Sequence, residues 1–183
     1  INALFSSATQ GFNAWGATPL TARCEILESI ADRLSAQRNS VIHILMKEGK
    51  KTIADAVAEI REAIDFCRYY AAQARITLRP DTLQGPTGES NILSLHPRGI
   101  FICISPWNFP LAIFTGQIAA ALVAGNSVIA KPAEQTPAIA AFTVKLFHDA
   151  GVPQNALQLA IGDGKLGAAL IQHPHVAGVC FTG

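Results

Sequence analysis

The sequence predicts an α/β fold in which an N-terminal helical segment precedes a parallel, doubly wound sheet. Apolar residues recur every three or four positions from Thr21 to about Ala74, the spacing typical of amphipathic helices. After Gly99, short apolar strands alternate strictly with helical stretches. Such alternation indicates parallel strands that are joined by right-handed crossovers.

The helical segment, residues 1–76, contains recognisable helix starts and stops. Thr18 and Pro19 start the first predicted helix, and Gly49 interrupts the second. Thr52 followed by Asp55 resembles a capping pair at the start of the next helix. The charged residues of the segment are expected on solvated faces, and they include Lys50, Lys51, Glu59, Arg61 and Glu62.

Residues 77–98 are predicted to form a loop and one strand outside the middle of the sheet. Prolines and glycines between positions 80 and 88 mark the loop, and the extended stretch 91–96 follows it. This stretch is partly polar and ends at Pro97, which suits an edge strand or a hairpin. We expect this region to bridge subunits of an oligomer.

Residues 99–183 alternate between strands and helices. Strands are predicted at 100–104, 128–130, 157–161 and 176–181, and helices at 111–124, 137–150 and 165–172. Gly125 and Gly151 provide the helix stops. Ligands of open parallel sheets bind beyond the carboxyl ends of the strands, so the residues that follow each strand are the candidates for a site.

The composition argues against nucleic acid as a partner and against a membrane span. The 183 residues carry a formal net charge of +1, only 15% of them are charged, and there is no run of Lys and Arg. Residues 99–130 lack charge, but Pro106, Pro110 and Gly125 divide them into pieces shorter than the roughly 20 apolar residues of a span. No signal peptide is expected at the start of the sequence.

The cysteine pattern predicts buried free thiols in a cytoplasmic protein. The cysteines lie far apart and form no CxxC pair: Cys24, Cys67, Cys103 and Cys180. A nucleophilic role for Cys103 or Cys180 is the alternative, although no histidine stands in a recognisable relation to either. His173 and His175 lack a nearby third ligand, so no metal site is predicted.

Lys131 and Glu134 suit a dinucleotide at the end of the second predicted strand. A strand-end ammonium can donate to the vicinal hydroxyls of an adenosine ribose, and a carboxylate can accept from them. Because a carboxylate also disfavours a 2′-phosphate, the pair favours NAD over NADP. A surface ion pair at a helix start is the alternative.

The stretch from Gly162 to Gly167 reads GDGKLG and matches the glycine pattern GxGxxG. It follows a predicted strand and opens a helix, as the pattern requires. The match indicates close approach to a cofactor only in combination with other features. It lies on the third strand unit rather than the first, and no clear acidic residue ends the next strand.

Asn108 is the candidate catalytic residue. Its side-chain amide follows the first predicted strand between two prolines, where it can donate to a developing oxyanion, a role worth roughly 3 kcal/mol. An ordinary turn residue is the alternative interpretation. The segment contains no nucleophile with a positioned base.

Three motifs at these separations are similar to those of the aldehyde dehydrogenase superfamily. They are Pro106-Trp107-Asn108-Phe109-Pro110, Lys131-Pro132-Ala133-Glu134 and Phe181-Thr182-Gly183. Residues 63–71 and 104–117 further resemble the dehydrogenase part of bifunctional proline utilisation A proteins. The resemblance covers nearly the whole chain. It implies an aldehyde-dehydrogenase-like, Rossmann-type sheet in which residues 99–183 form an incomplete NAD-binding domain, as a fragment of a larger fold.

The resemblance implies a role for each matched position. Asn108 would stabilise the oxyanion, and Lys131 and Glu134 would hold the adenosine ribose of NAD. The family's catalytic cysteine and general-base glutamate match nothing here, since both lie beyond the Phe-Thr-Gly turn. The other residues that would border the cofactor are Ile104, Ser105, Pro106, Trp107, Gly162, Gly167, Phe181, Thr182 and Gly183.

The resemblance also implies an activity for the parent protein. This is the NAD-dependent oxidation of L-glutamate γ-semialdehyde to L-glutamate in proline catabolism, by a homo-oligomer that takes a small aldehyde as its substrate. Two alternatives stay open. One is another aldehyde dehydrogenase, and the other is a non-catalytic module for cofactor binding or assembly.

Residues 1–183 on their own are expected to turn over no aldehyde, because they contain neither a matched nucleophile nor a matched base. The measurement is NADH production by this segment with NAD and an aldehyde. Any NAD-dependent turnover that Asn108→Ala abolishes would contradict the expectation.

Overall fold

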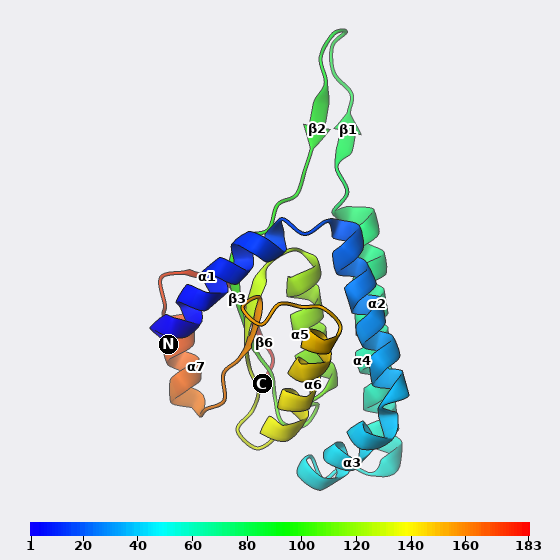
Figure 1. Ribbon diagram of the computed structural model, residues 1–183, viewed down its shortest axis with the longest axis vertical. Coiled ribbons are helices and arrows are strands. Elements are labelled where there is room, and N and C mark those ends of the chain that lie inside the picture. The colour runs from blue at the N-terminus through cyan, green and yellow to red at the C-terminus, as the bar shows by residue number, and fades with distance from the viewer.

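The computed structural model describes residues 1–183 and arranges them in layers around a parallel sheet. Helices α1 and α7 cover one face of the sheet, α5 and α6 cover the other, and α2 to α4 pack outside α5 and α6 (Figure 1). A long hairpin projects from one end of this body. The predicted α/β class, a helical segment followed by a parallel sheet, is confirmed.

The N-terminal segment folds into four helices, one more than the sequence analysis predicts. They are α1 (Asn2–Gly16), α2 (Leu20–Ala36), α3 (Arg38–Glu48) and α4 (Ile53–Thr77). The predicted helix start at Pro19 and stop at Gly49 are confirmed. Thr52 caps α4, since its Oγ1 accepts from the backbone N–H of Asp55 at 3.1 Å.

Helix α1 was not expected, although its sequence carries the signal. Phe5, Ala8 and Trp15 follow one another at three and seven residues and are all buried. Gly11 lies on the same face, where a Cβ atom would stand 2.1 Å from the carbonyl oxygen of Asn155. The missing side chain therefore lets α1 approach the loop before β5.

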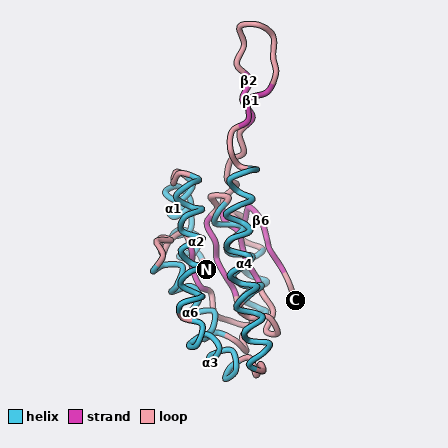
Figure 2. Tube along the Cα trace, turned by 90° about the vertical axis from the view of Figure 1, so that its right-hand side faces the viewer, coloured by secondary structure: helices cyan, strands magenta, loops and turns pink.

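The segment after α4 forms a hairpin that stands away from the body (Figure 2). Strands β1 (Asp81–Leu83) and β2 (Asn91–Leu93) pair antiparallel, with Thr82 opposite Ile92. The hairpin interpretation is therefore correct, and the edge-strand alternative is wrong because this pair is not hydrogen-bonded to the main sheet. The strand also ends at Leu93 rather than at His96.

The main sheet has the strand order β5-β4-β3-β6, with all pairs parallel. Its strands and crossover helices follow the predicted ranges within a few residues. They are β3 (Ile100–Ile104), α5 (Ala112–Val123), β4 (Ser127–Lys131), α6 (Pro137–Asp149), β5 (Leu157–Leu159), α7 (Gly164–Ile171) and β6 (Val176–Phe181). The strand order reverses between β3 and β6, and ligands of such sheets bind at this switch point.

The core is divided by the sheet into two clusters. On one face Phe5 and Ala8 of α1 pack against Ile100 and Ile102, together with Leu170 of α7. The larger cluster lies on the other face and joins α5 and α6 to helices α2 to α4. Burial of α5 on nearly all sides accounts for the charge-free stretch 99–130. None of the helices combines the length and the hydropathy of a transmembrane span.

Candidate functional site

The carboxyl ends of β3 and β6 are tied together at the switch point by Gln117 of α5. Its Nε2 donates to the carbonyl oxygen of Ile104 at 3.1 Å and to Oγ1 of Thr182 at 3.2 Å. The backbone N–H of Thr182 donates to the same carbonyl at 3.1 Å. Gln117 was not among the predicted site residues, yet it is the amide side chain of a largely buried helix whose other side chains, apart from Thr115, are apolar. A polar amide in a buried helix is unusual, and this was the signal in the sequence that could have identified Gln117.

The loop between β3 and α5 presents Asn108 at this edge. Its first residue is anchored, because the Ser105 N–H donates to the carbonyl oxygen of Lys131 at 3.3 Å. Trp107 is 57% exposed, and Asn108 is exposed beside it. Asn108 is therefore accessible to a substrate, whereas the preceding Pro106 is half-buried.

Lys131 is buried at the end of β4 and reaches toward Glu134. Its Nζ donates to the carbonyl oxygen of Pro132 at 3.0 Å and lies 3.9 Å from Oε2 of Glu134. The Glu134 carboxylate is half-exposed, so it is open to a ligand. An ammonium has three N–H donors, so Lys131 keeps donor capacity for a further partner.

The glycine run packs α7 against this lysine. A Cβ atom at Gly167 would lie 3.3 Å from Cδ of Lys131, so the glycine lets the helix approach it. A Cβ atom at Gly162 would lie 2.5 Å from a methyl group of Leu166. The start of α7 is capped by Asp163, whose Oδ1 accepts from Lys165 N at 3.0 Å and from Leu166 N at 3.2 Å. An acidic cap thus occupies the amides that an anion would otherwise bind.

Residues 181–183 follow β6 and complete the same edge. Phe181 stands opposite Ile104 in the register of β3 and β6 and is 68% exposed. Thr182 and Gly183 are also exposed. The structure therefore brings the predicted site residues of β3, β4, α7 and β6 to one edge of the sheet.

Two predictions about charged residues were wrong. Glu59 is buried in α4 rather than solvated, and Lys51 is nearly buried beside it. Glu59 follows Ala56 by three residues and precedes Ala63 by four, so it belongs to the buried stripe of the helix. This spacing was the signal in the sequence. Arg61 and Glu62 are exposed, as expected.

The cysteines are all free, as predicted, and Cys180 is only partly buried. Cys103 and Cys180 face each other on β3 and β6. A hydrogen bond from Cys103 lowers the pKa of the Cys180 thiol to about 7, whereas the same contact and burial raise the pKa of Cys103.

His173 and His175 contact aromatic rings rather than acidic or thiol side chains. The ring of His173 stacks on Phe5 at 3.6 Å between centroids and meets His175 edge-on. Desolvation is the largest of the causes that lower the pKa of His173, and the neighbouring His175 adds to it. No cluster of three metal-ligating side chains is present.

Comparison with known proteins decides the family. The sequence pattern of the aldehyde dehydrogenase family matches residues 1–183. The chain belongs to this family. It is 51% identical over 164 residues to bifunctional protein PutA of Rhizobium meliloti, across 90% of this chain and 12% of that protein. It is 36% identical over 178 residues to 1-pyrroline-5-carboxylate dehydrogenase of Geobacillus thermodenitrificans, across 97% of this chain and 35% of that protein.

A solved structure shows the same fold. A mutant of proline utilization A from Bradyrhizobium japonicum superposes with a TM-score of 0.98 and 55% identity, over 100% of this chain and 19% of that one. This aldehyde dehydrogenase chain therefore spans only a small part of the bifunctional relatives that it matches. The expected fold, an aldehyde-dehydrogenase-like sheet with an N-terminal helical segment, is confirmed.

Proposed function

We propose that the natural protein oxidises L-glutamate γ-semialdehyde to L-glutamate with NAD, and that residues 1–183 supply part of the cofactor cleft and one oxyanion donor. The observation that carries the proposal is that Asn108, and the neighbouring pair Lys131 and Glu134, follow adjacent parallel strands at the same edge of the sheet. The names of the relatives, PutA and 1-pyrroline-5-carboxylate dehydrogenase, support the choice of aldehyde.

The residues at this edge fit a dinucleotide. Ser105 Oγ is buried and has no hydrogen-bond partner within the chain, so a polar ligand atom would satisfy it. Lys131 and Glu134 would hold the adenosine ribose. Trp107 and Phe181 are exposed aromatic residues on either side of the switch point between β3 and β6. Bound NAD would supply the acceptor for the two electrons that leave the aldehyde.

Asn108 would stabilise charge on the substrate oxygen. Nucleophilic attack on an aldehyde carbon moves an electron pair onto that oxygen, and an N–H donor that is already in place lowers the energy of this state. The Asn108 side chain is exposed, at the end of a strand that is buried in the sheet. A fixed strand and an accessible amide are the combination that this role needs.

Replacing Glu134 with Gln should weaken the preference for NAD over NADP. A neutral amide keeps an acceptor for the ribose hydroxyl and removes the repulsion of a 2′-phosphate. We expect the ratio of kcat/KM values for the two cofactors to fall about tenfold, on the order of 1.4 kcal/mol. Glu25→Gln, at an exposed position of α2, is the control and should leave the ratio unchanged. An unchanged ratio in Glu134→Gln would remove this residue from the cofactor site.

The proposed function is tested by NADH production in the natural full-length protein. It is supplied with NAD and either L-glutamate γ-semialdehyde or simple aliphatic aldehydes. Selective turnover of the semialdehyde is the expected result. Turnover of the other aldehydes alone would keep the family and overturn this substrate, and no turnover by a folded sample would favour a non-catalytic module.

A further inference from the structure

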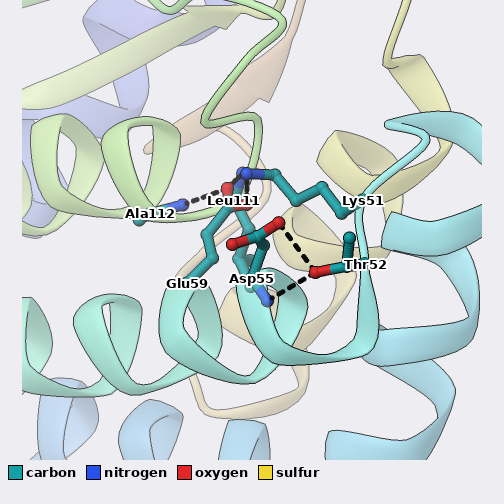
Figure 3. A network of polar contacts seen from close by, with 6 residues as sticks. All are labelled: Lys51, Thr52, Asp55, Glu59, Leu111 and Ala112. Carbon is teal, nitrogen blue, oxygen red and sulfur yellow. Dashed lines mark hydrogen bonds and ion pairs between the residues drawn. The ribbon is translucent and has the colours of Figure 1, made fainter.

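The backbone that carries Asn108 is held by a buried carboxylate from the helical segment. Oε1 of Glu59 accepts from the backbone N–H of Leu111 at 2.8 Å and from that of Ala112 at 3.2 Å (Figure 3). These amides open α5, and Leu111 lies three residues after Asn108. The negative charge also matches the positive end of the helix dipole. Glu59 therefore fixes the far end of the Asn108 loop.

Lys51 compensates the charge of this carboxylate. Its Nζ lies 2.8 Å from Oε2 of Glu59, and only 11% of the Lys51 side chain is exposed. The same Nζ lies 4.4 Å from the ring centroid of Phe109, in cation–π contact with the residue after Asn108. Figure 3 shows Lys51 and Glu59 converging on the start of α5. Lys51 thus contacts the loop itself as well as its anchor.

Pro110 is also buried, so residues 107–109 are the part of the loop that is exposed to solvent. The end of the loop next to β3 is held by the hydrogen bond from Ser105 N to the carbonyl oxygen of Lys131. Between the two anchors, Trp107 and Asn108 are exposed. The position of the Asn108 amide is therefore set by the two ends of the loop. Lys51 and Glu59, from the helical segment, hold one of these ends.

The charges of the pair also matter for an oxyanion. An unpaired carboxylate at the start of α5 would oppose negative charge that develops at Asn108, because like charges repel. Lys51 makes the anchor neutral as a whole. A neutral anchor can order the loop without opposing the reaction.

We propose that Lys51 and Glu59 are positioning residues that hold Asn108 for oxyanion stabilisation, an inference that rests on the proposed function. Neither touches the reacting atoms. They act through Leu111, Ala112 and Phe109, so their effect on the reaction depends on the presence of the Asn108 amide.

The test is a double-mutant cycle in the natural full-length protein at saturating NAD and semialdehyde. Glu59→Ala is expected to lower kcat about 10²-fold, the cost of misplacing a catalytic group by roughly 1 Å. In the Asn108→Ala background the same substitution should lower kcat no further, because the donor that it positions is gone. If the two losses multiply instead, Glu59 acts only on the general fold and the proposal is overturned.

Glu48→Ala is a matched control, because Glu48 caps α6 in the same way. Its two carboxylate oxygens accept from Ala138 N at 2.8 Å and from Ile139 N at 2.9 Å. This variant loses a comparable helix cap away from the Asn108 loop. The segment before α6 carries the cofactor residue Glu134 rather than the oxyanion donor, so this variant should leave kcat unchanged at saturating NAD. An equal loss of kcat in both variants would count against the proposal.

A rescue experiment separates the effect of the charges of Lys51 and Glu59 from the effect of the hydrogen bonds that Glu59 accepts. Lys51→Met leaves the buried carboxylate unpaired and should lower kcat, whereas Lys51→Met combined with Glu59→Gln removes both charges and keeps an acceptor oxygen. The kcat of the double variant should recover to within about fivefold of that of the natural protein.

If Glu59→Ala does not fold, Lys51→Met replaces it in the cycle with Asn108→Ala. Failure of Asn108→Ala itself to lower kcat would overturn the proposed function rather than the positioning alone.

Discussion

Replacing Asn108 with Ala in the natural full-length protein is expected to lower kcat about 10²–10³-fold, the loss that follows removal of one oxyanion donor. The structure places this amide exposed beyond β3, where it has no structural partner to lose. Because the donor acts on charge that develops during the reaction, KM should change little. The measurement is steady-state NADH production with L-glutamate γ-semialdehyde, together with a melting curve.

The control for this prediction is Asn39→Ala, which removes an exposed asparagine from α3, outside the candidate site. It should leave kcat and KM unchanged. If Asn108→Ala raises KM while kcat stays constant, Asn108 contributes equally to ground-state and transition-state binding. In that case Asn108 binds the substrate without acting as an oxyanion donor, whereas unchanged kcat and KM would support the alternative interpretation as an ordinary turn residue.

Replacing Trp15 with Ala should detach α1 from the end of α5. Trp15 is 1% exposed, and its Nε1 donates to the carbonyl oxygen of Leu122 at 2.8 Å. That carbonyl belongs to the last turn of α5 and also accepts from the backbone N–H of Gly125 at 2.9 Å, so it keeps a partner without the indole. The substitution leaves a large cavity and removes the indole hydrogen bond, so we expect local stability to fall by about 3–5 kcal/mol.

Amide hydrogen exchange of the full-length protein measures this effect locally. Peptides from α1 and the end of α5 should exchange roughly 10²–10⁴ times faster in Trp15→Ala, the factor that corresponds to about 3–5 kcal/mol. Trp107→Ala removes the other, 57% exposed, tryptophan and should leave exchange in α1 unchanged. Equal protection of α1 in the natural protein and in Trp15→Ala would show that this tryptophan does not anchor the helix.

The strands and crossover helices could be predicted because their signals are local. Alternation of short apolar runs with helical periods predicted the observed bounds of β3 and β6. It also predicted α5 to within one residue of its observed bounds at each end. The parallel arrangement then followed from chain order, and with it the edge of the sheet on which Asn108, Lys131 and Glu134 lie. Local periodicity and chain connectivity were sufficient for these features.

Other features depended on contacts between distant segments. Asp81–Leu83 became a strand only by pairing with Asn91–Leu93, since three exposed residues carry little pattern of their own. Gln117 joined the site because α5 lies across the ends of both β3 and β6. The sequence around one partner of such a contact does not identify the other, because the two meet only when the elements pack together.

The sequence by itself determined the order of the elements, the burial of α5 and the set of polar residues that follow the strands. It also contained the spacing that buries Glu59 with Ala56 and Ala63. Only the tertiary structure decided what this carboxylate does, because its partners at Leu111 and Ala112 lie 52 and 53 residues away along the chain. A buried charge is stable only where such partners converge, and that convergence is a property of the packed helices rather than of any local stretch.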